Sequence, residues 1–265
     1  MEPPWTVRVW IMFVILIHLA SQQVNAAELR YYSPVLSSQT RALGPGEADI
    51  FLAGFCQTPT RLVEGVGQTC TTRPLSAGFS DITGRTFHPK TFIVGHFLSP
   101  GSDDVAVGGW SAETHPYLWG GTLLLTRHKD SWTPVRYRSA MIIDSCEKVV
   151  LPDRRDLLLC EIEDSGMGHT LHYLYAVDFA HPSDLEHGLL AKADSFEDDC
   201  VSQKQILKTA RWSENKQEFS VVVDTTEWNH ISNAPYCAKY PKRRPSSLRL
   251  VFAVTSKGLQ KILGE

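Results

Sequence analysis

Short apolar runs bounded by turn-forming residues dominate this chain, whereas helical periodicity is scarce. The runs are rich in valine, leucine and aromatic residues, are bounded by glycine, proline, aspartate and serine, and lie at residues 49–53, 104–107, 122–126, 156–160, 171–177, 219–223 and 248–254. Such runs are typical of β-strands. Residues 203–212 fit a short helix or a strand equally well. Many short strands without helices between them predict an antiparallel all-β protein.

An acidic residue opens one of these strands in each of four similar segments. The acids are Asp49, Asp104, Asp156 and Glu218, and they are spaced by 55, 52 and 62 residues. In the last three segments a second apolar strand follows 15 to 35 residues later. Self-similarity at this period indicates a repeat architecture with several strands in each unit.

A repeat of this length favours a propeller-like array of about four antiparallel blades as the fold. Sheets set radially bury both faces against their neighbours and leave only short edges exposed. A β-sandwich is the alternative fold, because it also consists of short strands. An acid that recurs every fifty-odd residues is not expected of a sandwich.

The motif order in these segments resembles a known family of repeats. A small turn is followed by the acid, an apolar triplet, a loop, Gly-x-Leu-x-Leu and Trp-x-x-Val, and residues 94–107 (VGHFLSPGSDDVAV) are the best copy. This order resembles the FG-GAP or VCBS-type repeat, the blade unit of propellers in integrin alpha-chain heads and in many exported bacterial proteins. The resemblance spans most of the chain after residue 26, is clearest between residues 92 and 160, and implies a propeller.

The resemblance also implies a turn that commonly binds calcium through the pattern Asp-x-Asn-Gly-Asp-Gly-x-x-Asp. Calcium takes six to eight hard oxygen ligands, which such a loop supplies from alternate positions. In residues 96–104 the four ligand positions hold His96, Leu98, Pro100 and Asp104. The first three side chains cannot replace carboxylates on a hard cation. The turn is therefore interpreted as a scaffold without a metal. Residual calcium binding is the alternative, and a calcium titration would reveal it.

The other acidic turns support the same interpretation. Asp153 and Asp156 are separated by Arg154 and Arg155, whose positive charge repels a dication. We therefore predict no metal and no cofactor. The turn acids are expected to act structurally, as carboxylates that cap backbone N–H groups before each strand; they are Asp49, Asp104, Asp156 and Glu218.

The first 26 residues have the pattern of a secretory signal peptide. Arg8 precedes an apolar run at residues 9–20, and small or modest side chains lead to Ala26. A membrane anchor is the alternative, but a helix of this run spans about 18 Å against about 30 Å of bilayer core. We expect cleavage after Ala26 and a single β-rich repeat domain at residues 27–265 without a membrane span. We also expect secretion to the extracellular space, or to the periplasm in a bacterium.

Six cysteines favour disulfides in a chain of this kind, because an exported protein meets an oxidising compartment. Six thiols allow fifteen pairings, so connectivity does not follow strictly from the count. Two pairs of neighbours share a separation of 14 residues, which favours pairing in sequence order. The expected bridges are Cys56–Cys70, Cys146–Cys160 and Cys200–Cys237.

Two segments are candidate binding surfaces. Exposed aromatic residues stack on sugar rings or anchor a protein partner, and a Gly- and Pro-bearing loop holds Trp110, His115, Tyr117 and Trp119. The basic pair Arg243 and Arg244 could hold an acidic glycan or a phosphate. The alternatives are core packing for the aromatic residues and a solvated loop for the arginines.

Charge and motifs limit the function classes. A net charge of −3 argues against a dedicated nucleic-acid binder, and the chain contains no Gly-x-Ser-x-Gly motif of serine hydrolases. Residues 169–187 hold the densest group of metal-ligand types, but His169 and His172 should lie on opposite faces of a strand. We expect an exported, disulfide-stabilised binding or scaffold protein for an unknown protein or glycan ligand, with no assigned catalytic residue. A secreted hydrolase directed at glycans is the alternative.

Overall fold

The computed structural model describes residues 35–58, 60–63, 67–75, 79, 82–111, 120–139, 141–166, 168–181, 188–197, 200–215, 217–230, 237 and 244–264. The expected signal peptide lies outside the described residues, as do four of the candidate binding residues, His115, Tyr117, Trp119 and Arg243. Within the described part of the chain, no helix has the length and apolar character that a membrane span requires.

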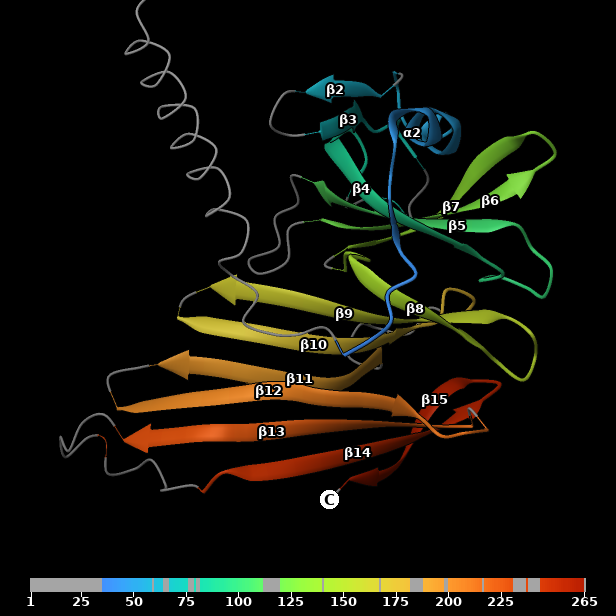
Figure 1. Ribbon diagram of the computed structural model, residues 1–265. Coiled ribbons are helices and arrows are strands. Elements are labelled where there is room, and N and C mark those ends of the chain that lie inside the picture. Colours follow the sequence, from blue (N-terminus) through green and yellow to red (C-terminus); the bar gives the residue numbers. More distant parts are fainter. Residues whose placement is uncertain are drawn as a thin grey trace, which may run out of the picture. The chain divides into compact units, whose positions relative to one another are not determined.

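The described residues form one α-helix and fifteen strands, and every strand pairing is antiparallel (Figure 1). The order is β1 (Arg41–Ala42), α2 (Pro45–Leu52), β2 (Arg61–Val63), β3 (Gly67–Thr71), β4 (Thr86–Gly95), β5 (Asp104–Ser111), β6 (Gly121–His128), β7 (Ser131–Ser139), β8 (Ser145–Val150), β9 (Asp156–Gly166), β10 (His169–Val177), β11 (Leu189–Glu197), β12 (Val201–Trp212), β13 (Glu218–His230), β14 (Ser246–Thr255) and β15 (Gly258–Gly264). The antiparallel all-β class is confirmed, and residues 203–212 lie in a strand.

The strands from β4 onward form three consecutive four-stranded meanders. The first meander is β4–β7, the second is β8–β11 and the third is β12–β15. The second and third belong to one sheet, but β11 and β12 pair at only two positions, Phe196 with Gln203 and Glu197 with Ser202. Glutamine side chains continue the junction, since Gln203 Nε2 donates to Asp194 O at 2.8 Å and Gln205 Oε1 accepts from Asp194 N at 3.0 Å.

The recurring acid marks the same position in each meander. Asp104, Asp156 and Glu218 are the first residues of β5, β9 and β13, which are the second strands of their meanders. The later apolar strands of the sequence pattern are β6, β10 and β14, the third strands. The sequence spacing therefore corresponds to a structural unit of four strands.

The first of the four sequence segments is different, because residues 45–52 form the helix α2 and not a strand. Pro45 stands at the first helical position, where its fixed φ and missing N–H are tolerated. Glu47 reaches back to accept a hydrogen bond from the Gly44 N–H at 3.0 Å. Phe51 and Leu52 are buried with Ala48 on one face of the helix. The prediction of a strand opened by Asp49 is therefore wrong.

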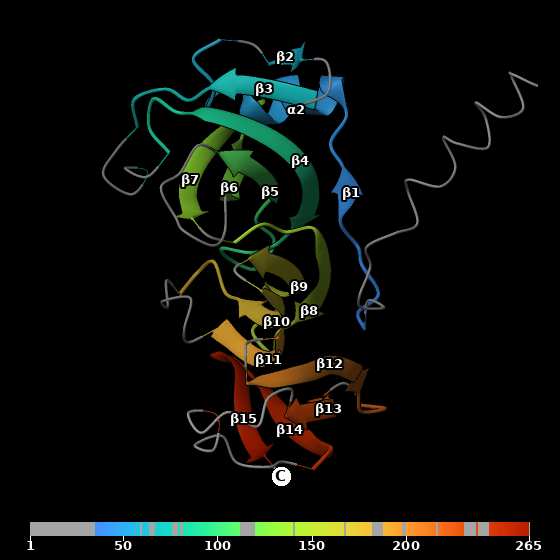
Figure 2. The same ribbon diagram turned by 90° about the vertical axis from the view of Figure 1, so that its left-hand side faces the viewer.

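The second meander lies between the first and the third (Figure 2), and residues on both of its faces join core clusters. In β9, Leu157 and Leu159 join a core cluster with residues of the third meander, such as Phe219. Leu158, between them, joins a cluster with first-meander residues, such as Leu124. Alternate residues of a strand face opposite sides of its sheet, so an unbroken leucine triplet is the expected pattern for a sheet covered on both sides.

The first meander is also covered on both sides. Val105 and Val107 of β5 pack in a cluster with Phe51 and Leu52 of α2, whereas Ala106 belongs to the cluster shared with the second meander. Figure 1 shows α2 lying over the sheet that contains β4–β7. The helix thus covers the face that no other meander covers.

Three disulfides cross-link the protein in the predicted sequence order. They are Cys56–Cys70, Cys146–Cys160 and Cys200–Cys237. Cys146 and Cys160 are direct register partners on β8 and β9, and both are fully buried. This bridge closes the turn that carries Asp153 and Arg155.

Candidate functional site: acidic turns and an aromatic strand-end surface

The Asp104 carboxylate holds the turn before β5. Its Oδ2 accepts hydrogen bonds from the Leu98 N–H at 2.8 Å and from the Ser102 hydroxyl at 2.6 Å. Gly101 supplies the positive φ of 78° that the turn requires. Asp104 is buried, so this carboxylate fastens backbone as expected of a turn acid.

Asp156 forms its hydrogen bonds with the preceding meander and not within its own turn. Its Oδ2 accepts from the His96 N–H at 2.9 Å, and its own N–H donates to His96 O at 2.9 Å. His96 lies 60 residues earlier, directly after β4. Asp156, the first residue of β9, therefore stabilises the end of β4 in the first meander.

The other two predicted turn acids make different contacts. Asp49, on α2, accepts a hydrogen bond from Thr60 Oγ1 at 2.6 Å. Before β13, the turn is closed by Ser213, whose Oγ accepts from the Glu218 N–H at 3.0 Å and whose N–H donates to Glu218 O at 2.9 Å. No hydrogen bond of the Glu218 carboxylate is found among the described residues, so a serine performs the predicted capping role there.

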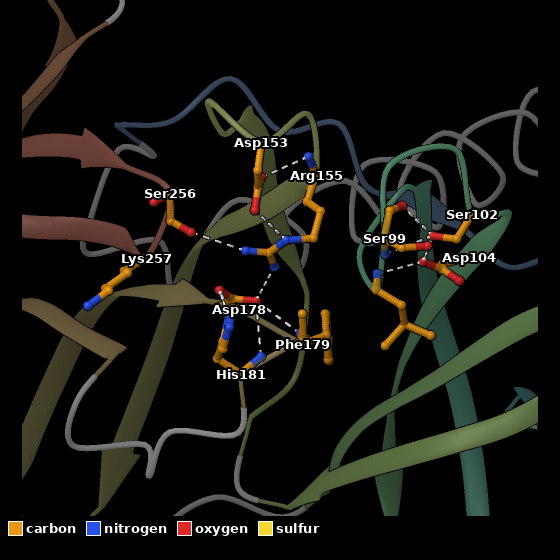
Figure 3. A network of polar contacts seen from close by, with 12 residues as sticks. Ser99, Ser102, Asp104, Asp153, Arg155, Asp178, Phe179, His181, Ser256 and Lys257 are labelled. Carbon is orange, nitrogen blue, oxygen red and sulfur yellow. Dashed lines mark hydrogen bonds and ion pairs between the residues drawn. The ribbon is translucent and has the colours of Figure 1, made fainter.

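Arg155 is the centre of a buried polar network at the turn end of the second meander (Figure 3). Its Nε donates to Asp153 Oδ2 at 2.7 Å, its Nη1 donates to Asp178 Oδ1 at 2.8 Å, and its Nη2 donates to Ser256 O at 3.2 Å. Ser256 lies in the turn between β14 and β15, so the guanidinium links the second meander to the third. A positively charged group of the protein itself thus occupies the space between two carboxylates.

Asp178 also orients a histidine. Its Oδ2 lies 3.0 Å from His181 Nδ1, and its Oδ1 accepts from the backbone N–H of Ala180 at 2.9 Å. The His181 side chain is 68% exposed, whereas that of Asp178 is 10% exposed. A buried carboxylate therefore positions an imidazole at the surface.

The network lowers the pKa of both of its carboxyl groups. Burial alone would raise the pKa of Asp178, but hydrogen bonds from His181 and Arg155 and the Arg155 charge hold it below its ordinary value. The pKa of Asp153 is also lowered, since contacts with Arg155 outweigh desolvation. Arg155 thus favours the charged form of Asp153, and His181 and Arg155 together favour that of Asp178.

No metal centre is evident in the described part of the chain, because no group of three or more histidine, cysteine, aspartate or glutamate side chains there is arranged to hold an ion. The sequence predicted that Arg154 and Arg155 would repel a dication. Arg155 is the one that lies between two carboxylates, whereas Arg154 is exposed and takes a positive φ of 67° in the turn.

The two described candidate binding residues lie near strand ends remote from these turns. Trp110 is 45% exposed near the end of β5 opposite to Asp104. Arg244 is exposed, two residues before β14 begins.

A partly exposed aromatic surface occupies the corresponding end of the second meander. His169 stacks on Phe196 across β10 and β11, with ring centroids 5.2 Å apart. Tyr173, also on β10, lies 5.6 Å from the Tyr175 ring, and Lys192 Nζ lies 5.7 Å from the Tyr173 centroid. We call the group of His169, Tyr173, Lys192 and Phe196 the aromatic surface.

Two carboxylates lie on the same sheet face as the aromatic surface. Asp164 on β9 and Asp194 on β11 are both register partners of Leu171, so they flank one position of β10. Burial raises the pKa of Asp164, and burial with the nearby Asp164 and Asp194 charges raises that of Tyr173. Burial also raises the pKa of Tyr175 to about 12.

Asp194 is held by two positively charged or chargeable partners. Its Oδ1 lies 2.9 Å from His169 Nδ1, and its Oδ2 lies 3.2 Å from Lys192 Nζ. Polar groups that can accept and donate hydrogen bonds are therefore placed beside stacked rings.

The sequence predicted neither the aromatic surface nor the Arg155 network as candidate sites. The surface brings residues from β10 and β11 together, and their register depends on the folded sheet. The signal available in the sequence was the alternation of polar and apolar residues in 169–177, with His169, Leu171, Tyr173 and Tyr175 on one face. As predicted, His172 lies on the other face, where it is buried near Glu161, with Nε2 3.4 Å from Oε2.

Comparison with known proteins gives no match: no family model, no curated protein and no solved structure resembles this chain at a significant level.

Proposed function

We propose that this protein is an exported, disulfide-stabilised binding protein that uses the aromatic surface of β10 and β11 to hold a glycan. The observation that carries the proposal is the partly exposed stack of His169 on Phe196 beside Asp194 and Lys192. Flat rings stack on the apolar faces of sugars, while the flanking charged groups match their hydroxyl groups.

Export is supported by the cysteines. All six form disulfides, and none is free. Disulfides form and persist in oxidising compartments such as the extracellular space and the bacterial periplasm. The signal-like residues 1–26 agree with this destination, and the destination itself stays part of the proposal.

The fold class behind the proposal is a degenerate propeller-like array of the FG-GAP or VCBS type. Three meanders that share core clusters face to face support it, as does the acid at the start of each second strand. The segment with α2 and β1–β3 takes the place of the expected fourth blade. Side chains near the strand ends would then make the ligand contacts on a rigid scaffold.

Glycan binding can be tested with the secreted form of the chain on an array of neutral and acidic oligosaccharides. His169→Ala and Phe196→Ala should each weaken binding about tenfold or more, the equivalent of about 1.4 kcal/mol. His128→Ala is the matched control, because His128 is an exposed histidine at the turn end of β6. The proposal fails if no oligosaccharide binds, or if the control weakens binding as much as His169→Ala does.

A hydrolase is the second candidate function, and the pair Asp164 and Asp194 favours it. Glycosidases use two carboxyl groups in contrasting environments, one protonated and one charged. Asp164 has a raised pKa, whereas Asp194 is paired with Lys192. Release of reducing ends from bound oligosaccharides, abolished by Asp164→Asn and retained in the exposed control Asp130→Asn, would favour hydrolysis over binding alone.

A further inference from the structure

A cavity of about 430 Å³ lies beside α2, on the side where the chain turns into β2. Its apolar lining comes from Ala48, Leu52 and Ala53, and the Cys56–Cys70 disulfide forms part of its wall. Its polar lining includes Asp49, Thr60 and Arg73. The volume lies within the range of small-molecule sites.

Asp49 contributes a negative charge to this cavity. Its Oδ1 accepts from Thr60 Oγ1 at 2.6 Å, which fixes the carboxylate on the surface of α2. No ion pair of Asp49 is formed among the described residues. The second carboxylate oxygen therefore has capacity for a donor on a ligand.

Arg73 contributes a positive charge that is held in place by backbone. Its Nε donates to Cys56 O at 2.5 Å, and its Nη2 donates to Ala53 O at 3.1 Å. A guanidinium has five N–H donors, so about three remain after these two bonds. Within the described part of the chain, Arg73 makes no ion pair either.

Two opposite charges thus line one cavity without pairing to each other. A ligand with only a negative charge would be repelled by Asp49. A ligand with only a positive charge would be repelled by Arg73. A ligand with one ammonium and one carboxylate satisfies both groups, and an apolar side chain on it fits beside the exposed Ala53 at the end of α2. Charge-assisted hydrogen bonds of this kind are the stronger class.

We propose that this cavity binds a zwitterionic amino acid or short peptide, with its carboxylate on Arg73, its ammonium group on Asp49 and an apolar side chain against α2. The site is separate from the aromatic surface. Failure of one proposal therefore leaves the other standing.

Calorimetric titration of the secreted chain with L-leucine and with leucyl-leucine tests the proposal, and the two probes distinguish a free amino acid from a peptide. One of them should bind with a Kd of about 1 mM or tighter. L-Leucinamide lacks the carboxylate and N-acetyl-L-leucine lacks the ammonium group. Each should bind about tenfold more weakly, because one charge-assisted contact is lost.

Variants assign the two ends of the ligand. Asp49→Asn keeps a partner for Thr60 and should remove the preference for leucine over its N-acetyl form. Arg73→Gln should remove the preference for leucine over L-leucinamide. Arg61→Gln on the exposed strand β2 is the control and should change neither preference, and thermal melting shows that each variant is folded.

Three results would overturn the proposal. The first is that neither leucine nor leucyl-leucine binds. The second is that both blocked analogues bind as tightly as leucine. The third is that a folded Asp49→Asn variant retains the full preference for the free ammonium group.

Discussion

Arg155 Nη1 and Asp178 Oδ1 form an ion pair 2.8 Å long in which the side chains are only 6% and 10% exposed. The pair lies where the turn before β9 meets the end of β10, and the same guanidinium reaches Asp153 and the carbonyl of Ser256. Removing one partner of such a pair leaves the other charge buried without compensation.

Arg155→Met should therefore destabilise the protein by about 3–5 kcal/mol. The measurement is urea unfolding at pH 7, followed by circular dichroism. The neighbouring Arg154→Met is the control and should stay within about 0.5 kcal/mol, because Arg154 is exposed. If both variants lost the same free energy of unfolding, the buried network around Arg155 would not be the source of the loss.

Stability should fall in acid because of Asp178. Its pKa lies below the ordinary value, so between the two values the unfolded chain binds a proton that the native state does not. The stabilisation is fully present above the ordinary carboxyl pKa of about 3.9 and is lost as the pH falls through the native value. Urea midpoints measured from pH 6 to pH 3 should decline in the wild type, and Asp178→Asn should flatten that decline. A steeper decline in the variant would contradict the assignment.

Gly95→Ala should separate the first two meanders where Asp156 meets the end of β4. A Cβ at Gly95 would lie 2.7 Å from Asp156 Oδ2 and 2.7 Å from the Phe97 ring. Overpacking of this kind costs about 1–3 kcal/mol. Gly46→Ala is the matched control, because its Cβ meets nothing within 4 Å and alanine favours the helix by about 0.5–1 kcal/mol. Thermal melting should thus shift in opposite directions, and a shift in the same direction would argue against this packing.

Calcium should leave the melting temperature unchanged. Asp104 Oδ2 already binds Leu98 N and Ser102 Oγ, and Arg155 supplies the positive charge between Asp153 and Asp178. A site with a Kd of about 0.1 mM would stabilise the native state by about 2.7 kcal/mol at 10 mM calcium. Scanning calorimetry with and without calcium would detect such a gain as a rise of several degrees.

Replacement of Cys146 and Cys160 by alanine should cost about 3 kcal/mol, the value expected for a closed loop of about 15 residues. The two cysteines are register partners, so the strand pairing of β8 and β9 can persist without the bridge. Urea unfolding of the double variant is the measurement. A loss near zero would mean that the turn around Arg155 is already ordered in the unfolded chain.

The strands were predictable where both sheet faces are buried. Leu157, Leu158 and Leu159 give an unbroken apolar run because neighbouring sheets cover both sides. Two disulfides were predictable because the cysteines of Cys56–Cys70 and Cys146–Cys160 are only 14 residues apart, whereas Cys200–Cys237 spans 37 residues. The helix α2 was mistaken for a strand because residues 50–52 are as apolar as a strand triplet. The helix signals, Pro45 and Glu47, were nevertheless present.

The candidate sites were less accessible from sequence. Arg155 was assigned a charge, but its partner Asp178 lies 23 residues later and is brought near by the pairing of β9 with β10. His169 and Phe196 meet through the register of β10 with β11. Long-range register of this kind depends on the packing of whole sheets, which local patterns do not encode.

Neighbouring meanders cover Leu157, Leu158 and Leu159 of the second meander on both sides, and this affects how a growing chain folds. When β11 has left the ribosome, Leu157 and Leu159 still await Phe219 and Val221, which belong to a strand that is not yet made. Until β13 has been synthesised, the apolar surface formed by Leu157 and Leu159 is exposed to water and to other chains. Holdase chaperones are therefore expected to bind the unfinished sheet during synthesis.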